Sequence, residues 1–184
     1  YRRVIGYNGQ VSVRLLIAKS RICPKQGKLT IPRIELSAAV LAARILVTLR
    51  RELDDCFDST YLWSDSTAVL AYLRNEQTRF HVFLGNRIQE IRATTSIDQW
   101  RHVPGAKNPA DVLTRPFNPK DGFNSDHQFY RGPSFLYEDE SAWPITDLNL
   151  KVDDNDPEVR KTDQQVASCI CQAFAAVQTS STDN

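Results

Sequence analysis

Three carboxylates have the residue type and the placement that metal-dependent chemistry needs. Glu35 opens an apolar stretch with helical spacing, Asp65 ends the short apolar run 61–64, and Asp111 follows the Asn-Pro pair at 108 and 109. Mg²⁺ takes oxygen ligands, and two such ions about 3.5–4 Å apart can activate a water and stabilise the leaving oxygen of a phosphodiester. The three acids therefore predict a phosphodiester-cleaving metal centre that requires neither Cys nor His.

Each acid alone also has a structural explanation. A first-turn Glu or Asp complements the helix dipole, which would account for Glu35 and Asp111, and Asp65 could cap the following helix. The spacing of Glu35 to Ala39 and Leu46, however, puts this acid on the buried face of its helix. Because all three stand at the tips of elements of one layer, we favour a shared metal site, with carboxyl groups within about 10 Å of each other.

The elements that must position these acids indicate an α/β fold. Two β-prone runs, 1–5 and 11–18, flank Asn8-Gly9 and predict a hairpin, and Pro32 predicts the first turn of a helix that ends near Leu53. The later elements are expected as follows: a strand at 59–64, helices at 66–74 and 80–91, a strand at 97–103, and a helix that opens at Asn108-Pro109. This order is typical of helices layered on a mixed sheet.

Length and composition narrow the class of protein. The 184 residues, 41% hydrophobic, fit one domain with appendages. No apolar run approaches the roughly 18 residues of a membrane span, and the first residues do not form a signal peptide. Four scattered cysteines without zinc-ligand spacing suggest reduced thiols, so we expect an intracellular, cytoplasmic protein without a membrane partner. No Met occurs, which suggests a piece of a longer protein.

Charge is distributed unevenly along the chain. Residues 1–120 hold 19 Lys and Arg against 10 Asp and Glu, a net +9, whereas residues 121–184 hold 4 against 12, a net −8. A basic body favours a polyanionic partner, with ordinary solvated surface as the alternative. We divide the chain into a domain at 1–117, an aromatic and Pro-rich extension at 118–150, and an acidic, disordered linker at 151–184 that is dispensable for folding.

Several sequence blocks and their spacing resemble a known family. They are Lys19-Ser20-Arg21, Leu29-Thr30-Ile31-Pro32-Arg33-Ile34-Glu35-Leu36, Leu62-Trp63-Ser64-Asp65-Ser66-Thr67, and Trp100-Arg101-His102-Val103-Pro104-Gly105 with Asn108-Pro109-Ala110-Asp111. Over residues 1 to about 147 the chain resembles the ribonuclease H domain of BEL/Pao-type retrotransposon Pol polyproteins and the segment that follows it.

The resemblance implies a ribonuclease-H-like mixed sheet of five strands with flanking helices. It also implies four catalytic acids that bind two Mg²⁺ or Mn²⁺ ions, of which Glu35, Asp65 and Asp111 match the second, third and fourth. The first acid would lie upstream of Tyr1, on a first strand that is truncated here, so we expect this chain alone to be a poor nuclease. Ala106 stands where many cellular members have a loop His, and His102 is interpreted as a packing or surface residue.

The function implied is that of an endonuclease that hydrolyses the RNA strand of RNA–DNA hybrids during reverse transcription. Its partners would be the hybrid, a reverse transcriptase upstream and an integrase downstream. Arg74, Arg79 and Lys107 are candidate phosphate contacts. One alternative is a catalytically dead, truncated module that only binds nucleic acid or holds polyprotein architecture. Another is a different nuclease or integrase on the same fold.

Overall fold

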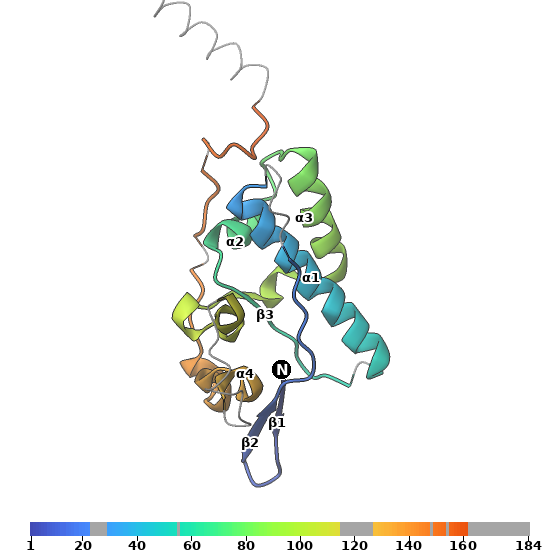
Figure 1. The fold of residues 1–184 in the computed structure, drawn as a ribbon, viewed down its shortest axis with the longest axis vertical. Helices are drawn as coiled ribbons and strands as arrows, with labels where there is room; N and C mark the ends of the chain where they lie inside the picture. The colour runs from blue at the N-terminus through green and yellow to red at the C-terminus, as the bar shows by residue number, and fades with distance from the viewer. Residues whose placement is uncertain (23–28, 55, 115–126, 148, 154, 162–184) are drawn as a thin grey trace, which may run out of the picture.

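The structure, a computed structural model, describes residues 1–22, 29–54, 56–114, 127–147, 149–153 and 155–161 (Figure 1). Its helices and strands, in chain order, are β1 Arg2–Ile5, β2 Val11–Arg14, α1 Ile31–Glu52, β3 Leu62–Ser64, α2 Thr67–Arg74, α3 Val82–Thr94, β4 Trp100–His102 and α4 Gln128–Arg131. Short 3₁₀ turns connect the later elements. Up to β4 this is the predicted α/β order, with shorter strands. The helix expected at Asn108-Pro109 is instead the short 3₁₀ helix Pro109–Thr114, and α4 was not predicted.

The described strands form two separate two-stranded sheets. β1 and β2 make the predicted antiparallel hairpin, in which Gly9 adopts a φ of 77°. β3 and β4 pair in parallel. The five-stranded sheet is therefore not what the described residues form. β4 is shorter than predicted because Ser96 and Gln99 make a capping box that turns residues 97–99 into a 3₁₀ helix.

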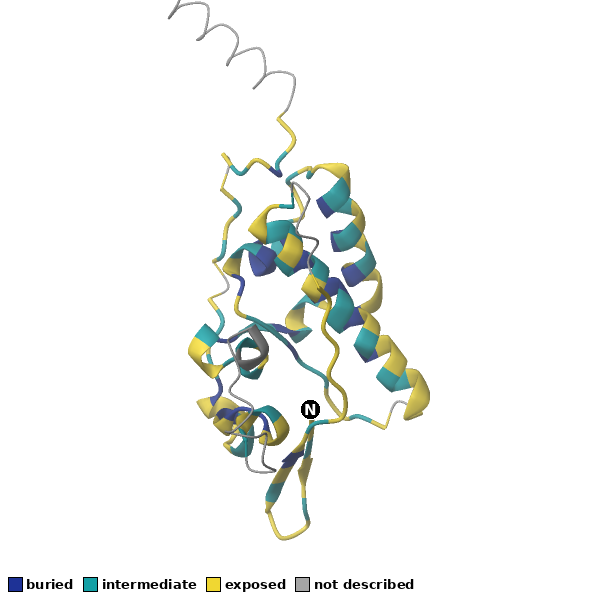
Figure 2. Cartoon of the chain, viewed as in Figure 1, coloured by how far each residue is buried: buried dark blue, intermediate teal, exposed yellow. Residues whose placement is uncertain are grey.

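Helix α1 organises the main hydrophobic core. As the sequence predicts, Thr30 stands at its N-cap position and Pro32 lies in its first turn. The buried face of α1 packs against α2 and α3, and Figure 2 marks the buried positions along these helices in dark blue. Trp100 of β4 closes this core from the sheet side, where its indole N–H donates to Thr95 Oγ1 at 2.9 Å. None of the described helices combines the length and the apolar character that crossing a membrane requires.

A second cluster covers the other face of β3. Because side chains alternate along a strand, Leu62 joins the helical core, whereas Tyr61 and Trp63 pack against Phe135 and Trp143 from the aromatic extension. The described part of the extension therefore packs on the sheet. Of the four cysteines, Cys56 is an exposed free thiol, and Cys23, Cys169 and Cys171 lie outside the described residues.

The acidic segment differs from its prediction. Residues 149–153 and 155–161, called the C-terminal strap below, run back along the helical layer (Figure 1). Val159 forms an antiparallel bridge with Phe80, and Leu150 and Val152 pack against the main core. The described strap residues therefore pack on the helical layer, because apolar side chains interrupt their acidic composition and find partners. Residues 162–184 lie outside the described part.

Candidate metal centre

Glu35 is held where α1 meets the start of α2. Its half-buried carboxylate accepts a hydrogen bond from Ser66 Oγ at 2.5 Å. The same hydroxyl oxygen accepts from the Val69 N–H at 3.2 Å and so caps α2. Glu35 lies on the otherwise apolar face of α1, and Ser66 is the polar partner that it contacts there.

Asp65 is not the helix cap that the sequence allowed it to be, because Ser66 has that role. Asp65 is exposed, and its Oδ2 accepts a hydrogen bond from Asn108 Nδ2 at 3.2 Å. The other side of the Asn108 amide, Oδ1, accepts from the Ala110 N–H at 3.1 Å, and this contact starts the 3₁₀ turn Pro109–Thr114 that carries Asp111. Asn108 therefore links the turn that carries Asp111 to the side chain of Asp65.

Asp65 and Asp111 face the same glycine. A Cβ on Gly105 would lie 3.5 Å from Asp111 Oδ2 and 3.9 Å from Asp65 Oδ2. These two carboxylate oxygens are therefore no farther apart than the sum of the two distances. Because β3 and β4 are parallel, both acids follow strand ends at one edge of the sheet, and Glu35 reaches the same edge through Ser66.

The donor chemistry at this edge suits a hard cation. Glu35, Asp65 and Asp111 offer carboxylate oxygens, the ligands that Mg²⁺ prefers. In the part of the chain that the structure describes, however, no three His, Cys, Asp or Glu side chains are grouped closely enough to form one metal site. Glu35, Asp65 and Asp111 lie at this edge of the β3–β4 sheet. Their role as metal ligands stays a prediction.

The family comparison covers the first part of this site. Residues 1–66 match the Pao retrotransposon-like RNaseH-like domain. This match confirms the resemblance for that part of the chain, which holds Glu35 and Asp65, whereas Asp111 lies beyond it. Among curated proteins and among solved structures, no match was found.

The predicted phosphate contacts are divided between the two ends of α2. Lys107 is exposed in the turn Gly105–Lys107, which begins at the glycine that Asp65 and Asp111 both approach. Arg74 ends α2, one helix length of about 12 Å from Asp65, and donates to the Trp100 carbonyl at 3.2 Å. Arg79 lies in the loop between α2 and α3, where its carbonyl accepts from the Arg160 N–H at 2.8 Å.

Two other residues stand near this edge as the sequence predicts. His102 is half-buried on β4, and its N–H donates to Thr146 Oγ1 at 2.7 Å, in keeping with a packing role. Ala106 is exposed beside Lys107. The sequence analysis missed Ser66 and Gly105, and it interpreted Asn108 only as a cap. The Ser-Asp-Ser run at 64–66 was the available signal for Ser66.

Proposed function

We propose that the chain is a retroelement ribonuclease H module that hydrolyses the RNA strand of RNA–DNA hybrids. The observation that carries this proposal is the approach of Asp65 and Asp111 to Gly105 at the carboxyl edge of a parallel strand pair. Glu35 adds a third carboxylate through Ser66. The match of residues 1–66 to an RNaseH-like family supports the same assignment.

In such a site some residues of the chain would bind the metal ions and others would orient these ligands. Asp65, Asp111 and Glu35 would hold two divalent ions, which supply an activated water and stabilise the leaving oxygen. Ser66 fixes the orientation of the Glu35 carboxylate, and Asn108 fixes that of Asp65.

The substrate would be held mainly through phosphates. The exposed Lys107 stands beside the acids, and the first 120 residues carry the net +9 described above. RNA would be distinguished from DNA by its 2′-hydroxyls in the shallow minor groove of the hybrid.

The test is Mg²⁺-dependent cleavage of a labelled RNA–DNA hybrid, with duplex DNA as a second substrate. Asp65→Asn and Asp111→Asn should each reduce cleavage to background, because each removes a charged ligand. Asp98→Asn is the matched control, since Asp98 is an exposed acid before β4, at the opposite edge of the sheet. Equal activity in the control and the site variants would refute the assignment.

The resemblance places a further acid upstream of Tyr1, so cleavage should be measured both for this chain and for one lengthened by upstream parental sequence. We expect weak cleavage by the first and strong cleavage by the second. Binding of hybrid without cleavage by either one would instead establish the nucleic-acid-binding structural module.

A further inference from the structure

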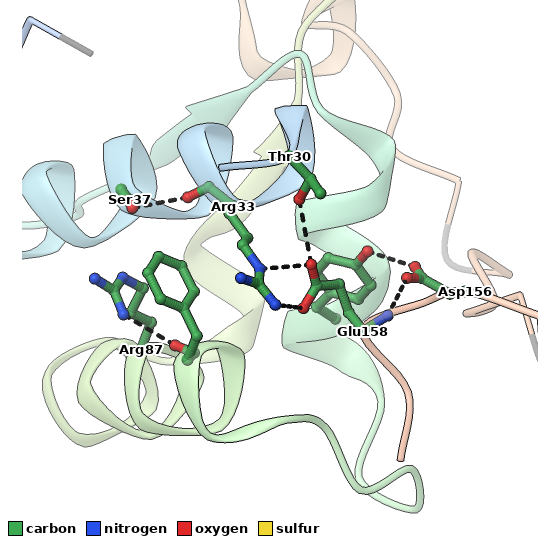
Figure 3. Close-up of polar contacts among 8 residues, drawn as sticks. Thr30, Arg33, Ser37, Arg87, Asp156 and Glu158 are labelled. Carbon is green, nitrogen blue, oxygen red and sulfur yellow. Dashed lines mark hydrogen bonds and ion pairs between the residues drawn. The ribbon is translucent and has the colours of Figure 1, made fainter. Parts of the chain in front are cut away.

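A buried ion pair ties the C-terminal strap to the start of α1 (Figure 3). The Glu158 side chain is only 2% exposed and receives two hydrogen bonds from the Arg33 guanidinium, at 2.6 and 2.9 Å. Thr30 Oγ1 donates to the same carboxylate at 3.2 Å. The strap thereby holds both the residue before α1 and its first turn.

The strap is also fixed to α2 and to the loop after it. The Tyr72 hydroxyl, on α2, donates to Asp156 Oδ2 at 2.5 Å, and Asp156 Oδ1 accepts from the Glu158 N–H at 2.9 Å. The Glu158 carbonyl accepts from the His81 N–H at 2.9 Å. Glu158 and Asp156 together therefore have partners on three parts of the helical layer: the start of α1, α2 and the residue before α3.

These contacts close a ring that contains Glu35. From Arg33 the ring passes through Glu158 and Asp156 to Tyr72, then along α2 to its cap Ser66, and from there back to Glu35 on α1. Burial and the bond to Asp156 raise the pKa of Tyr72, and the charges of Glu158 and Glu35 raise it further. The Tyr72 hydroxyl therefore senses the charges of the strap acids Asp156 and Glu158 and also the charge of Glu35 on α1.

We propose that Arg33 and Glu158 are positioning residues for Glu35. The first turn of a helix has N–H groups without intrahelical partners and frays easily. Glu35 lies directly after that turn of α1 and must keep one orientation to act with Asp65 and Asp111. By clamping that turn to α2, the strap keeps the Glu35 carboxylate on Ser66. The importance given to Glu35 rests on the proposed function, whereas the clamp itself does not.

α1 contains a matched control for this proposal. Arg44 and Glu90 form an ion pair of the same kind between α1 and α3, at 2.6 and 3.1 Å, with both side chains largely exposed. Glu158→Gln and Glu90→Gln therefore remove the same charge from the same type of pair, at different distances from Glu35.

The first readout is hydrogen–deuterium exchange in the full chain. Glu158→Gln should accelerate exchange of the amides of residues 35–37 by about tenfold or more beyond any acceleration of the β4 amides, which report global unfolding. Glu90→Gln should leave residues 35–37 unchanged. Equal protection of these residues in wild type and Glu158→Gln would overturn the clamp.

The second readout is a double-mutant cycle, which separates positioning of Glu35 from general stabilisation. In the Glu158→Gln background, the effect of Glu35→Gln on the unfolding equilibrium constant should shrink several-fold, because the Ser66 contact is already weakened there. In the Glu90→Gln background it should be unchanged to within about twofold. Should Glu158→Gln not fold, Tyr72→Phe replaces it as a milder release of the strap. Additivity in the strap variants would contradict the proposal.

The third readout is Mn²⁺ affinity, measured by calorimetry on the same variants. We expect weaker binding by Glu158→Gln than by Glu90→Gln. If wild type binds Mn²⁺ and Glu158→Gln binds it equally well, the positioning role is refuted. If wild type does not bind Mn²⁺, the proposed metal centre fails, and the exchange and cycle results still decide whether the strap positions Glu35.

Discussion

Two arginine–glutamate pairs attach α1 to its surroundings with nearly the same geometry and in different environments. In both, Nε lies 2.6 Å from a carboxylate oxygen. The exposed fractions of the Arg and Glu side chains are 28% and 2% for Arg33–Glu158, against 62% and 39% for Arg44–Glu90. Water can replace the lost partner only in the second pair, so breaking the first should cost much more.

The difference between the pairs coincides with the position of the candidate site. The buried pair holds the first turn of α1, directly before Glu35, whereas the exposed pair lies farther along the helix, where α1 carries no predicted site residue. The less exposed of the two ion pairs thus holds α1 close to Glu35, the acid that must keep a fixed orientation. The contrast yields the following predictions.

Removing the strap should have the largest effect. A chain ending at residue 150 should have a free energy of unfolding at least about 3 kcal/mol lower than one ending at residue 161, because it loses the buried ion pair and the burial of Val152. Both chains lack residues 162–184, so the difference reports the strap alone. Urea denaturation measures it, and equal midpoints would restore the linker interpretation of residues 151–161.

Glu158→Gln should destabilise the fold nearly as much, by about 3 kcal/mol, because Arg33 then lacks its buried counter-charge. The loss should not exceed that of the shorter chain, since the variant can release the strap and expose Arg33 to water. Denaturation of the full chain at pH 7 tests this order. A loss no greater than that of Glu90→Gln would show that burial does not distinguish the two pairs.

Tyr72→Phe should cost about 1 kcal/mol, the typical value of one hydrogen bond. Because the pKa of Tyr72 is raised in the folded protein above its ordinary 10.0, mainly by burial, the unfolded chain loses the phenolic proton first. This contribution is complete below pH 10 and falls as the pH rises above it. Wild type should therefore lose more stability than Tyr72→Phe between pH 9 and 11, and parallel curves would contradict the role of the hydroxyl.

Glu90→Gln should have the smallest effect. The hydrogen bond from Arg44 lowers the pKa of Glu90 below 4.5, so its contribution exists above that value and disappears as the pH falls through the lowered pKa. The stability difference from wild type should be slight at pH 7, absent in strong acid and reduced by salt. A salt-insensitive difference would show that this pair is less exposed to solvent than its environment indicates.

Local sequence signals predicted the elements that short-range physics determines. The hairpin turn at Asn8-Gly9 and the start of α1 at Pro32 follow from backbone preferences of those residues, and both occur. Glu35 was singled out because an acid on an apolar helix face needs a polar partner, and it has one in the structure. That partner, Ser66, could not be identified, because the choice depends on how two helices pack.

The strap shows the other limit of sequence reasoning. Glu158 lies in an acidic stretch whose composition is typical of linkers, and its partner Arg33 stands 125 residues away. Composition averages over the few apolar residues, such as Val152 and Val159, that attach the segment. The five-stranded sheet was expected from a family resemblance and not from the short strands, and the described residues form only two-stranded pairs.

The central claim is that Asp65, Asp111 and Glu35 share divalent ions at the carboxyl edge of β3 and β4. The most direct measurement is a crystal structure of the full chain soaked in Mn²⁺, with anomalous scattering used to locate the metal. We predict an anomalous peak beside Gly105 with carboxylate oxygens of Asp65 and Asp111 about 2.0–2.2 Å away, which vanishes in Asp65→Asn. A well-ordered edge without such a peak, or a peak that Asp65→Asn leaves unchanged, would contradict the account.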